Sequence, residues 1–308
     1  MSMAISAKRV PKNDRSSNTR ARWKSDQIAA ILFVSPFILA FLVLFLGPAI
    51  YALVVSFFRY AGYGSMTWVG VYNYFATLQY RLFWIGLRNT IFYWIAHDIP
   101  MMVFAFGLAL IVSNRYIQFK RFFKPMLYLP QLVTSVASAL IFSSFFGLEY
   151  GVLNTILGTK IPWLQDVNYT RWAVVILLIW RGVGYWFIVY LAGLTSINPE
   201  IIEASIVDGA NSWKRLIYVI LPLMTSTLLF AFVVDAIGSL RLFTEPNVLM
   251  AQRGGLAPYE VAPVVNVLFS SMGAARFGQA AAVGWLLFLV TALISWLQFR
   301  IFRNINKE

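Results

Sequence analysis

The sequence predicts an all-α integral membrane protein with six transmembrane helices, and three observations support this prediction. Of the 308 residues, 60% are hydrophobic and only 12% are charged, which is about half the charged fraction of a soluble domain. The mean hydropathy is +0.71. Six separate segments are apolar enough, and long enough at roughly 20 residues each, to cross a hydrocarbon core as helices. Helices are expected because a backbone surrounded by lipid must satisfy its own hydrogen bonds.

The six predicted spans are distributed along the whole chain. They comprise residues 28–58, 90–113, 125–146, 172–194, 221–240 and 280–299. The first is free of charge and contains Pro36 and Pro48, and its apolar run is too long for a signal peptide. A seventh apolar stretch, 261–272, is short and follows Pro258, so we predict an interfacial or external helix there.

The distribution of Lys and Arg predicts which side each loop occupies. Sixteen of these residues flank the spans on the side of the two termini, and eight lie on the opposite side. Because positive charge is retained in the cytoplasm, both termini are predicted to be cytoplasmic. The predicted organisation is a basic N-terminal tail over residues 1–27, disordered up to Lys24, a six-helix domain over 28–302 and a cytoplasmic tail over 303–308.

Composition also excludes several kinds of chemistry. The chain has no cysteine, so disulfides, thiolate metal sites and cysteine nucleophiles are excluded. Its single histidine has no partner of its kind, so no metal site is predicted. The net charge of +13 lies mostly beside the spans, where membrane lipid is a better partner than nucleic acid. No phosphate-binding Gly-x-x-x-x-Gly-Lys-Ser/Thr motif is present, so this chain should not bind or hydrolyse ATP alone. No cofactor is predicted for the chain itself.

The loop between the fourth and fifth predicted spans, 197–222, has the pattern of a helix, a turn and a second helix. Asn198 can cap a helix that begins at Pro199 and runs to about Val207. Asp208 and Gly209 then form a turn, because glycine readily adopts a positive φ.

The second helix of this loop is predicted to be amphipathic. Asn211 or Ser212 can cap it. Its single apolar face is formed by Trp213, Leu216, Ile217 and Ile220. Two interpretations fit: the loop docks a partner, or it is an interfacial hairpin that closes the cytoplasmic end of the bundle.

The loop resembles the EAA motif of the permease subunits of binding-protein-dependent ABC importers. The matching residues are Glu203, Ala204, Ser205, Gly209, Val219, Ile220, Leu221 and Pro222. Ser205 replaces the usual Ala and Val219 the usual Ile. The run Asp208, Gly209, Ala210 resembles the carbohydrate branch of the family, which includes maltose, glycerol-phosphate and multiple-sugar permeases. Further likeness extends over most of the chain, except that 247–263 departs from the family pattern.

This resemblance implies a type I ABC importer permease fold in the cytoplasmic membrane of a bacterium or archaeon. The chain would form half of a pore with a second permease subunit, usually as a heterodimer. An external solute-binding protein would deliver a sugar, oligosaccharide or polyol. ATP and Mg would be bound by separate ATPase subunits. The chain itself would then not be an enzyme.

Residues 199–210 would be the coupling helix seated in a groove of the ATPase. Glu203 would be the anchoring charge, Gly209 would permit the turn, and Ala204 and Ser205 would allow close approach. Asp208 and Ala210 complete the predicted coupling site.

Four ionisable residues lie inside predicted spans, where such groups are expensive and often functional. His97 and Asp98 lie in the second span, Arg181 in the fourth and Asp235 in the fifth. Either Asp98 or Asp235 could pair with Arg181 across the bundle. Alternatively, these residues line a sugar path together with aromatic side chains. The candidate substrate-path residues are Asp98, Trp180, Arg181, Tyr185, Trp186 and Asp235.

Two other functions are compatible with the composition. An ion-coupled secondary transporter could use His97, Asp98 and Asp235 as a proton or sodium relay, but this leaves the loop motif without a role. A membrane-embedded enzyme would need a nucleophile and base or a metal cluster, and the sequence shows neither.

Overall fold

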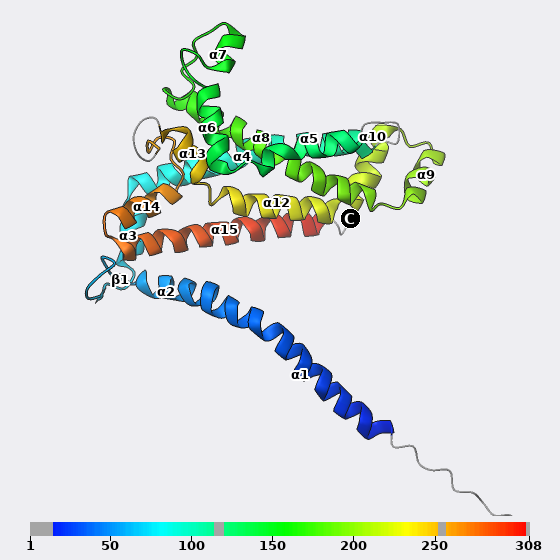
Figure 1. Ribbon diagram of the computed structural model, residues 1–308, viewed down its shortest axis with the longest axis horizontal. Coiled ribbons are helices and arrows are strands. Elements are labelled where there is room, and N and C mark those ends of the chain that lie inside the picture. Colours follow the sequence, from blue (N-terminus) through cyan, green and yellow to red (C-terminus); the bar gives the residue numbers. More distant parts are fainter. Residues whose placement is uncertain (1–14, 114–119, 252–256, 306–308) are drawn as a thin grey trace, which may run out of the picture. The chain divides into compact units, whose positions relative to one another are not determined.

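The computed structural model describes residues 15–113, 120–251 and 257–305. It divides into two compact units, Met1–Val54 and Val55–Glu308. Helices dominate both units (Figure 1). The second unit also contains a short antiparallel ribbon, in which β1 (Phe58–Arg59) pairs with β2 (Thr67–Trp68).

The first unit contains a long helix that is apolar from Ile28 onward. It comprises α1 (Arg15–Phe41), a π-helical turn η1 (Leu42–Leu46) and α2 (Gly47–Val55). The π-turn precedes Pro48, which has no N–H to continue the regular i→i−4 ladder. The predicted span is confirmed by a candidate span over Ile28–Val55.

The prediction of disorder up to Lys24 is wrong for residues 15–24, and residues 1–14 lie outside the described part of the chain. The helix extends back to Arg15 because residues 15–35 contain no glycine or proline to stop it.

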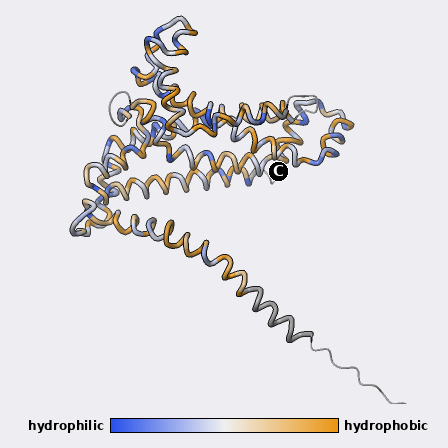
Figure 2. The backbone as a smooth tube through the Cα atoms, in the orientation of Figure 1, coloured by the Kyte–Doolittle hydropathy of each residue, from blue (hydrophilic) through white to orange (hydrophobic). Residues whose placement is uncertain are grey.

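Three predicted spans of the second unit are continuous helices. They are α4 (Arg81–Ser113), α8 (Val167–Thr195) and α15 (Phe277–Ile305). All three begin before the predicted residue, because the helical ladder continues beyond the apolar segment. Helices α4 and α8 pack against each other along their length (Figure 1). Apolar residues run along these helices (Figure 2).

The other two predicted spans each contain a bend that the sequence did not predict, one inside residues 125–146 and one near the start of residues 221–240. Helix α5 (Lys120–Leu132) meets α6 (Ser135–Phe145) at 93°. Pro130 lies in the last turn of α5, and the Thr134 hydroxyl caps α6 by accepting from the Ala137 N–H at 3.2 Å. A proline and a new N-cap four residues apart are typical of a helix that ends and restarts.

The second bend lies at Met224. The segment Ser212–Leu223 comprises α10 (Ser212–Arg215), η2 (Leu216–Ile220) and α11 (Leu221–Leu223), and it meets α12 (Thr225–Ser239) at 68°. If each bent pair counts as one span, the described residues contain up to six spans, as the sequence predicts.

Shorter helices connect the spans. They are α3 (Tyr72–Gln79), α7 (Val152–Leu157), α9 (Pro199–Val207), α13 (Thr244–Leu249) and α14 (Val265–Gly273). Helix α14 confirms the short helix predicted within residues 261–272. Helices α3 and α14 lie at one end of the bundle and α9 at the other (Figure 1).

The loop that departs from the family pattern is anchored at its second half. The Asn89 amide donates to the carbonyls of Glu260 and Ala262 at 2.9 and 3.0 Å. The Tyr93 hydroxyl donates to the Val261 carbonyl at 2.8 Å, and the Arg171 guanidinium donates to the Glu260 carbonyl at 2.8 Å. Three side chains from α4 and α8 therefore fix a loop that is about 90 to 170 residues away in sequence.

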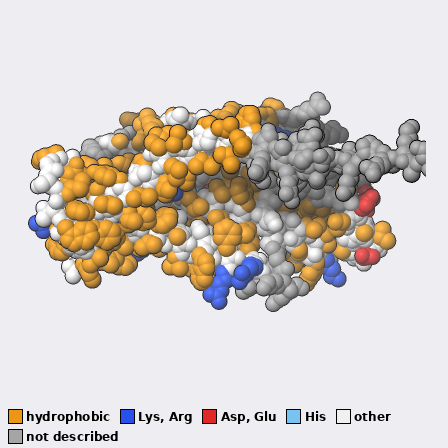
Figure 3. Space-filling model, turned by 90° about the horizontal axis from the view of Figure 1, so that it is seen from below, with side chains coloured by type: hydrophobic (Ala, Val, Ile, Leu, Met, Phe, Trp, Pro, Cys, Tyr) orange, Lys and Arg blue, Asp and Glu red, His pale blue; other side chains and the backbone are white. Residues whose placement is uncertain are grey.

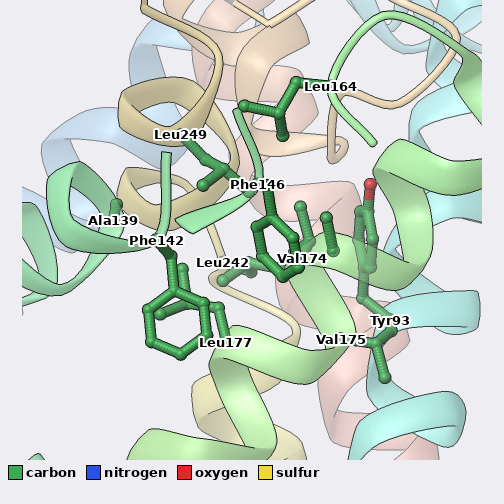
Figure 4. Close-up of a cluster of buried hydrophobic side chains, with 11 residues drawn as sticks. Tyr93, Ala139, Phe142, Phe146, Leu164, Val174, Val175, Leu177, Leu242 and Leu249 are labelled. Carbon is green, nitrogen blue, oxygen red and sulfur yellow. The ribbon is translucent and has the colours of Figure 1, made fainter. Parts of the chain in front are cut away.

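One of the buried hydrophobic clusters of the second unit lies where α4, α6, α8 and α13 meet. Tyr93, Phe146 and Leu177 are fully buried there (Figure 4). Outside the core the surface stays apolar: Val103 is 65% exposed and Phe288 55% exposed. Hydrophobic side chains cover most of the described surface in the view of Figure 3. So much exposed apolar area fits a lipid environment rather than water.

Candidate functional site

The loop after α8 folds as a helix, a glycine turn and a second helix, which confirms the predicted secondary structure. The Asn198 carboxamide oxygen accepts from the Glu200 N–H at 3.1 Å, and Pro199 is the first residue of α9. Gly209 has φ +78°. The turn closes where the Ala210 N–H donates to the Ser205 carbonyl at 3.0 Å. A residue with a Cβ would be strained at this φ.

The motif residues on α9 face different ways. Glu203, Ala204 and Asp208 are exposed, and Val207 is 87% exposed. Ser205 is buried, and its hydroxyl donates to the Ile202 carbonyl at 2.7 Å. The outer surface of α9 is therefore acidic and apolar, and Ser205 belongs to its inner side.

The four residues of the predicted apolar face of the second helix do not all face the protein interior. Asn211 caps α10 by accepting from the Lys214 N–H at 2.8 Å. Leu216 and Ile220 are half-buried, but Trp213 is 68% exposed and Ile217 is 38% exposed. The π-turn η2 adds a residue to the helical turn, so the face counted at 3.6 residues per turn does not keep its direction.

A cavity of about 340 Å³ lies beside the break between α5 and α6 and the end of α12. Polar and charged side chains gather in its wall. They are His97, Gln131, Arg181, Asp235, Ser239, Arg241, Thr244 and Glu245. The cavity therefore collects three of the four ionisable residues that the sequence placed inside spans.

Arg181 forms an ion pair with Glu245 of α13. The two side chains are 18% and 10% exposed. The sequence offered Asp98 or Asp235 as the partner of Arg181, and the structure corrects this. Glu245 was missed because it lies after the predicted fifth span, although an acidic residue beside Pro246 in an apolar stretch was a usable signal.

Asp235 is held by residues from three helices. Its carboxylate lies 3.2 Å from His97 Nε2 of α4, accepts from Trp186 Nε1 of α8 at 2.9 Å and accepts from the Ser239 hydroxyl at 3.2 Å. His97 Nδ1 lies 2.7 Å from the Tyr93 carbonyl and must carry a proton, because a carbonyl only accepts. The contact between His97 and Asp235 is then a hydrogen bond only when the pair holds a second proton.

The remaining predicted path residues do not line this cavity. Asp98 is 2% exposed, and its carboxyl group interacts with that of Asp235, although its Oδ1 has no hydrogen-bond partner among the described residues. Trp180 packs against Phe142 with ring centroids 5.1 Å apart. Tyr185 lines a separate, mostly apolar groove of about 310 Å³ that also includes Tyr128.

These features define a class of protein: a multi-spanning helical membrane protein with a protruding loop helix and a polar cavity between bent spans. Comparison with known proteins identifies the family. Residues 101–307 match the model of the binding-protein-dependent transport system inner membrane component, so the chain belongs to this family and is a permease subunit of an ABC importer.

Related proteins align with this chain over nearly its whole length. The lactose transport system permease protein LacF of Rhizobium radiobacter is 32% identical over 87% of this chain and 92% of its own length. The arabinooligosaccharides transport system permease protein AraP of Bacillus subtilis is 29% identical over 97% and 96%. A crystal structure of a bacterial ABC transporter that imports the acidic polysaccharide alginate matches with a TM-score of 0.77 at 24% identity, covering 92% of this chain and 99% of that one.

Proposed function

We propose that this permease imports a carbohydrate and that α9 couples it to a separate ATPase on the cytoplasmic side of the membrane. The observation that carries the proposal is the helix–turn–helix loop, which presents Glu203 on an exposed helix beyond the end of the spans. A protruding rigid helix suits a device that transmits movement between two subunits. In this arrangement both termini are cytoplasmic, as the Lys and Arg distribution predicts.

Two observations support a carbohydrate as the substrate. Relatives that match this chain over most of their length are permeases for lactose and arabinooligosaccharides. The cavity also has suitable chemistry, because Arg181 pairs with Glu245 and His97 contacts Asp235. The wall carries two guanidinium groups, Arg181 and Arg241, and two carboxyl groups, Asp235 and Glu245, and such a wall offers hydrogen bonds to the hydroxyls of a neutral ligand.

The cavity would be one part of the substrate path. It lies between the bent spans, and spans of a membrane protein tolerate interrupted helices where these border a water-filled cavity. Asp98 does not line the cavity but interacts with the carboxyl group of Asp235, which does, so it would act through that side chain. Trp180 and Tyr185 would act elsewhere on the path or only in packing. The full pore would need a second permease subunit, and delivery would need an external binding protein, as in the structural neighbour solved with a periplasmic protein.

ATP and Mg would be bound by the ATPase subunits and not by this chain. An ion-coupled transporter that uses His97, Asp98 and Asp235 would instead transport without an ATPase. The two functions therefore differ in whether uptake survives loss of the ATPase.

The coupling role can be tested with Glu203→Lys, using Glu200→Lys on the same exposed helix as the matched control. We expect Glu203→Lys to abolish sugar uptake and co-purification of the ATPase, while the amount of protein in the membrane stays unchanged. Glu200→Lys should retain most uptake. If Glu203→Lys and Gly209→Pro both transport normally, α9 does not couple this permease to an ATPase.

A further inference from the structure

In the loop around Gly209, the acidic residues precede the glycine and the basic residues follow it. The α9 side carries Glu200, Glu203 and Asp208, and no Lys or Arg occurs between Arg181 and Lys214. The following segment carries Lys214 and Arg215, and no Asp or Glu occurs from residue 209 to residue 234. All three acidic side chains and Lys214 are exposed. A negatively charged surface would therefore attract Ser212–Leu223 and repel α9.

The apolar residues exposed on Ser212–Leu223 are of the type that gathers at a membrane interface. Trp213 is 68% exposed, Tyr218 74% and Leu223 50%. Trp and Tyr are enriched at the level of the lipid headgroups, where one side of the ring is apolar and the other is hydrated. Lys214 lies between the two aromatic residues in sequence, so a cation is available at the same level.

The orientation of Ser212–Leu223 also fits a position at the membrane interface. Ser212–Leu223 is bent by 68° from α12, and it runs across the ends of the long helices near α9 (Figure 1). Its inner side is fixed to the bundle, since Ile220 packs into the buried cluster that contains Met224 and Tyr190. One side of the helix is thus held by protein, and the other presents Trp213 and Tyr218 outward.

We propose that Ser212–Leu223 is an interfacial helix that binds the anionic lipid surface of the cytoplasmic leaflet through Trp213, Lys214 and Tyr218, while α9 stays outside the lipid. This inference rests on the proposed cytoplasmic orientation of the loop. Gly209 then separates α9, which docks on the ATPase, from Ser212–Leu223, which the lipid holds at a fixed depth in the membrane. A push on α9 would then turn Ser212–Leu223 within the headgroup layer and move α12, instead of displacing the whole loop toward the lipid.

The absence of native cysteine allows a direct test of depth in the full-length protein. Single-cysteine variants Trp213→Cys and Tyr218→Cys are labelled with a nitroxide and reconstituted in vesicles containing three parts phosphatidylcholine and one part phosphatidylglycerol. Val207→Cys on α9 is the water-exposed control, and Phe288→Cys on α15 is the lipid-exposed control. Collision rates with oxygen, which favours lipid, and with a polar nickel chelate then report the depth of each label.

We expect labels at 213 and 218 to favour oxygen over the nickel chelate much more than the label at 207, and less than the label at 288. Nickel accessibility equal to that at 207 would overturn the proposal and indicate a water-facing surface for a protein partner. Low accessibility to both quenchers would also overturn it, because the helix would then be buried in protein.

The contribution of charge is tested by adding Lys214→Gln to the Tyr218→Cys variant. Near an anionic surface, one cation is expected to change the ratio of membrane-inserted to water-exposed label by about fivefold. This change should occur in the phosphatidylglycerol vesicles and not in pure phosphatidylcholine. Equal ratios in both lipids would exclude a role for Lys214.

The orientation is measured separately, so that failure of the proposed function is distinguishable from failure of this inference. A membrane-impermeant maleimide should label Val207→Cys in inside-out vesicles and not in right-side-out vesicles. Labelling from the opposite side would overturn the coupling role of α9. Correct labelling at 207 with water-exposed labels at 213 and 218 would overturn only the lipid contact.

Discussion

Replacing Glu245 with Leu should destabilise the protein strongly, because it leaves the Arg181 guanidinium without its ion-pair partner. The Arg181 side chain is only 18% exposed and its Nε already has no hydrogen-bond partner among the described residues. Breaking a buried ion pair on one side typically costs about 3–5 kcal/mol. Because the pair borders a cavity that water can enter, we expect the lower end, about 3 kcal/mol. Removing both charges with Arg181→Met and Glu245→Leu should cost much less.

The assay is the apparent melting temperature in detergent, followed for the single and double variants as a double-mutant cycle. About 3 kcal/mol corresponds to a decrease of roughly 5 °C or more in a chain of this size. The matched control is Glu149→Gln, which breaks an exposed ion pair with Lys160 whose side chains are 57% and 69% exposed. This control should change stability by less than about 1 kcal/mol. Additive effects of the two single variants would show that Arg181 and Glu245 are not coupled, and the reasoning would fail.

Three further predictions concern single positions. Gly209→Ala should strain the turn by about 1–2 kcal/mol. The strain comes from the φ of +78° alone, since the added Cβ would meet no atom within 4 Å. Gly209→Asn should be milder, and protease sensitivity of the loop distinguishes the two variants. Asn154→Ala should loosen the segment around α7, because the buried amide accepts from Trp163 Nε1 at 2.9 Å and donates to the Ile161 carbonyl at the same distance; faster amide exchange over residues 147–166 is the readout, and unchanged exchange contradicts the prediction. Asn89→Leu should free the loop at 257–264, because two carbonyls lose their donor; exchange there should rise while α15 stays protected.

Apolar length alone located the spans, because membrane thickness sets a minimum for each helix. Apolar length could not locate the two bends, since a hydropathy pattern contains no information about the direction of a helix axis. The third predicted span contains Pro125 and Pro130, and prolines are common in transmembrane helices without breaking them. The decisive feature was Thr134, whose hydroxyl caps a new helix. A polar cap inside an apolar run is the local signal that was available.

The caps of the loop were predictable because they depend on residues adjacent in sequence. Asn198, Pro199, Gly209 and Asn211 each act within a few residues, and the structure places each in the expected role. Glu245 could have been recognised from the sequence as a candidate, but its pairing with Arg181 could not. Arg181 meets a residue 64 positions away in sequence, and such pairing depends on how α8 and α13 pack.

The bends and the buried charges are parts of one arrangement. A helix that breaks in lipid leaves backbone groups without partners, and this is tolerated only where protein or a water-filled cavity receives them. The break after α5 places Gln131 in the cavity wall, and the segment after α12 places Thr244 and Glu245 there. The cavity makes the interrupted backbone tolerable, and the interrupted backbone in turn lets α13 bring an acidic side chain to Arg181. A straight third span would carry α6 away from α13, which it contacts, and would disrupt this cavity wall. For this reason a variant that restores a continuous helix at residues 130–134, such as Pro130→Ala combined with Thr134→Leu, should lose transport even if it remains stable and keeps the loop at Gly209 intact. Normal sugar uptake by a variant shown to have a continuous helix would separate the bend from the transport path.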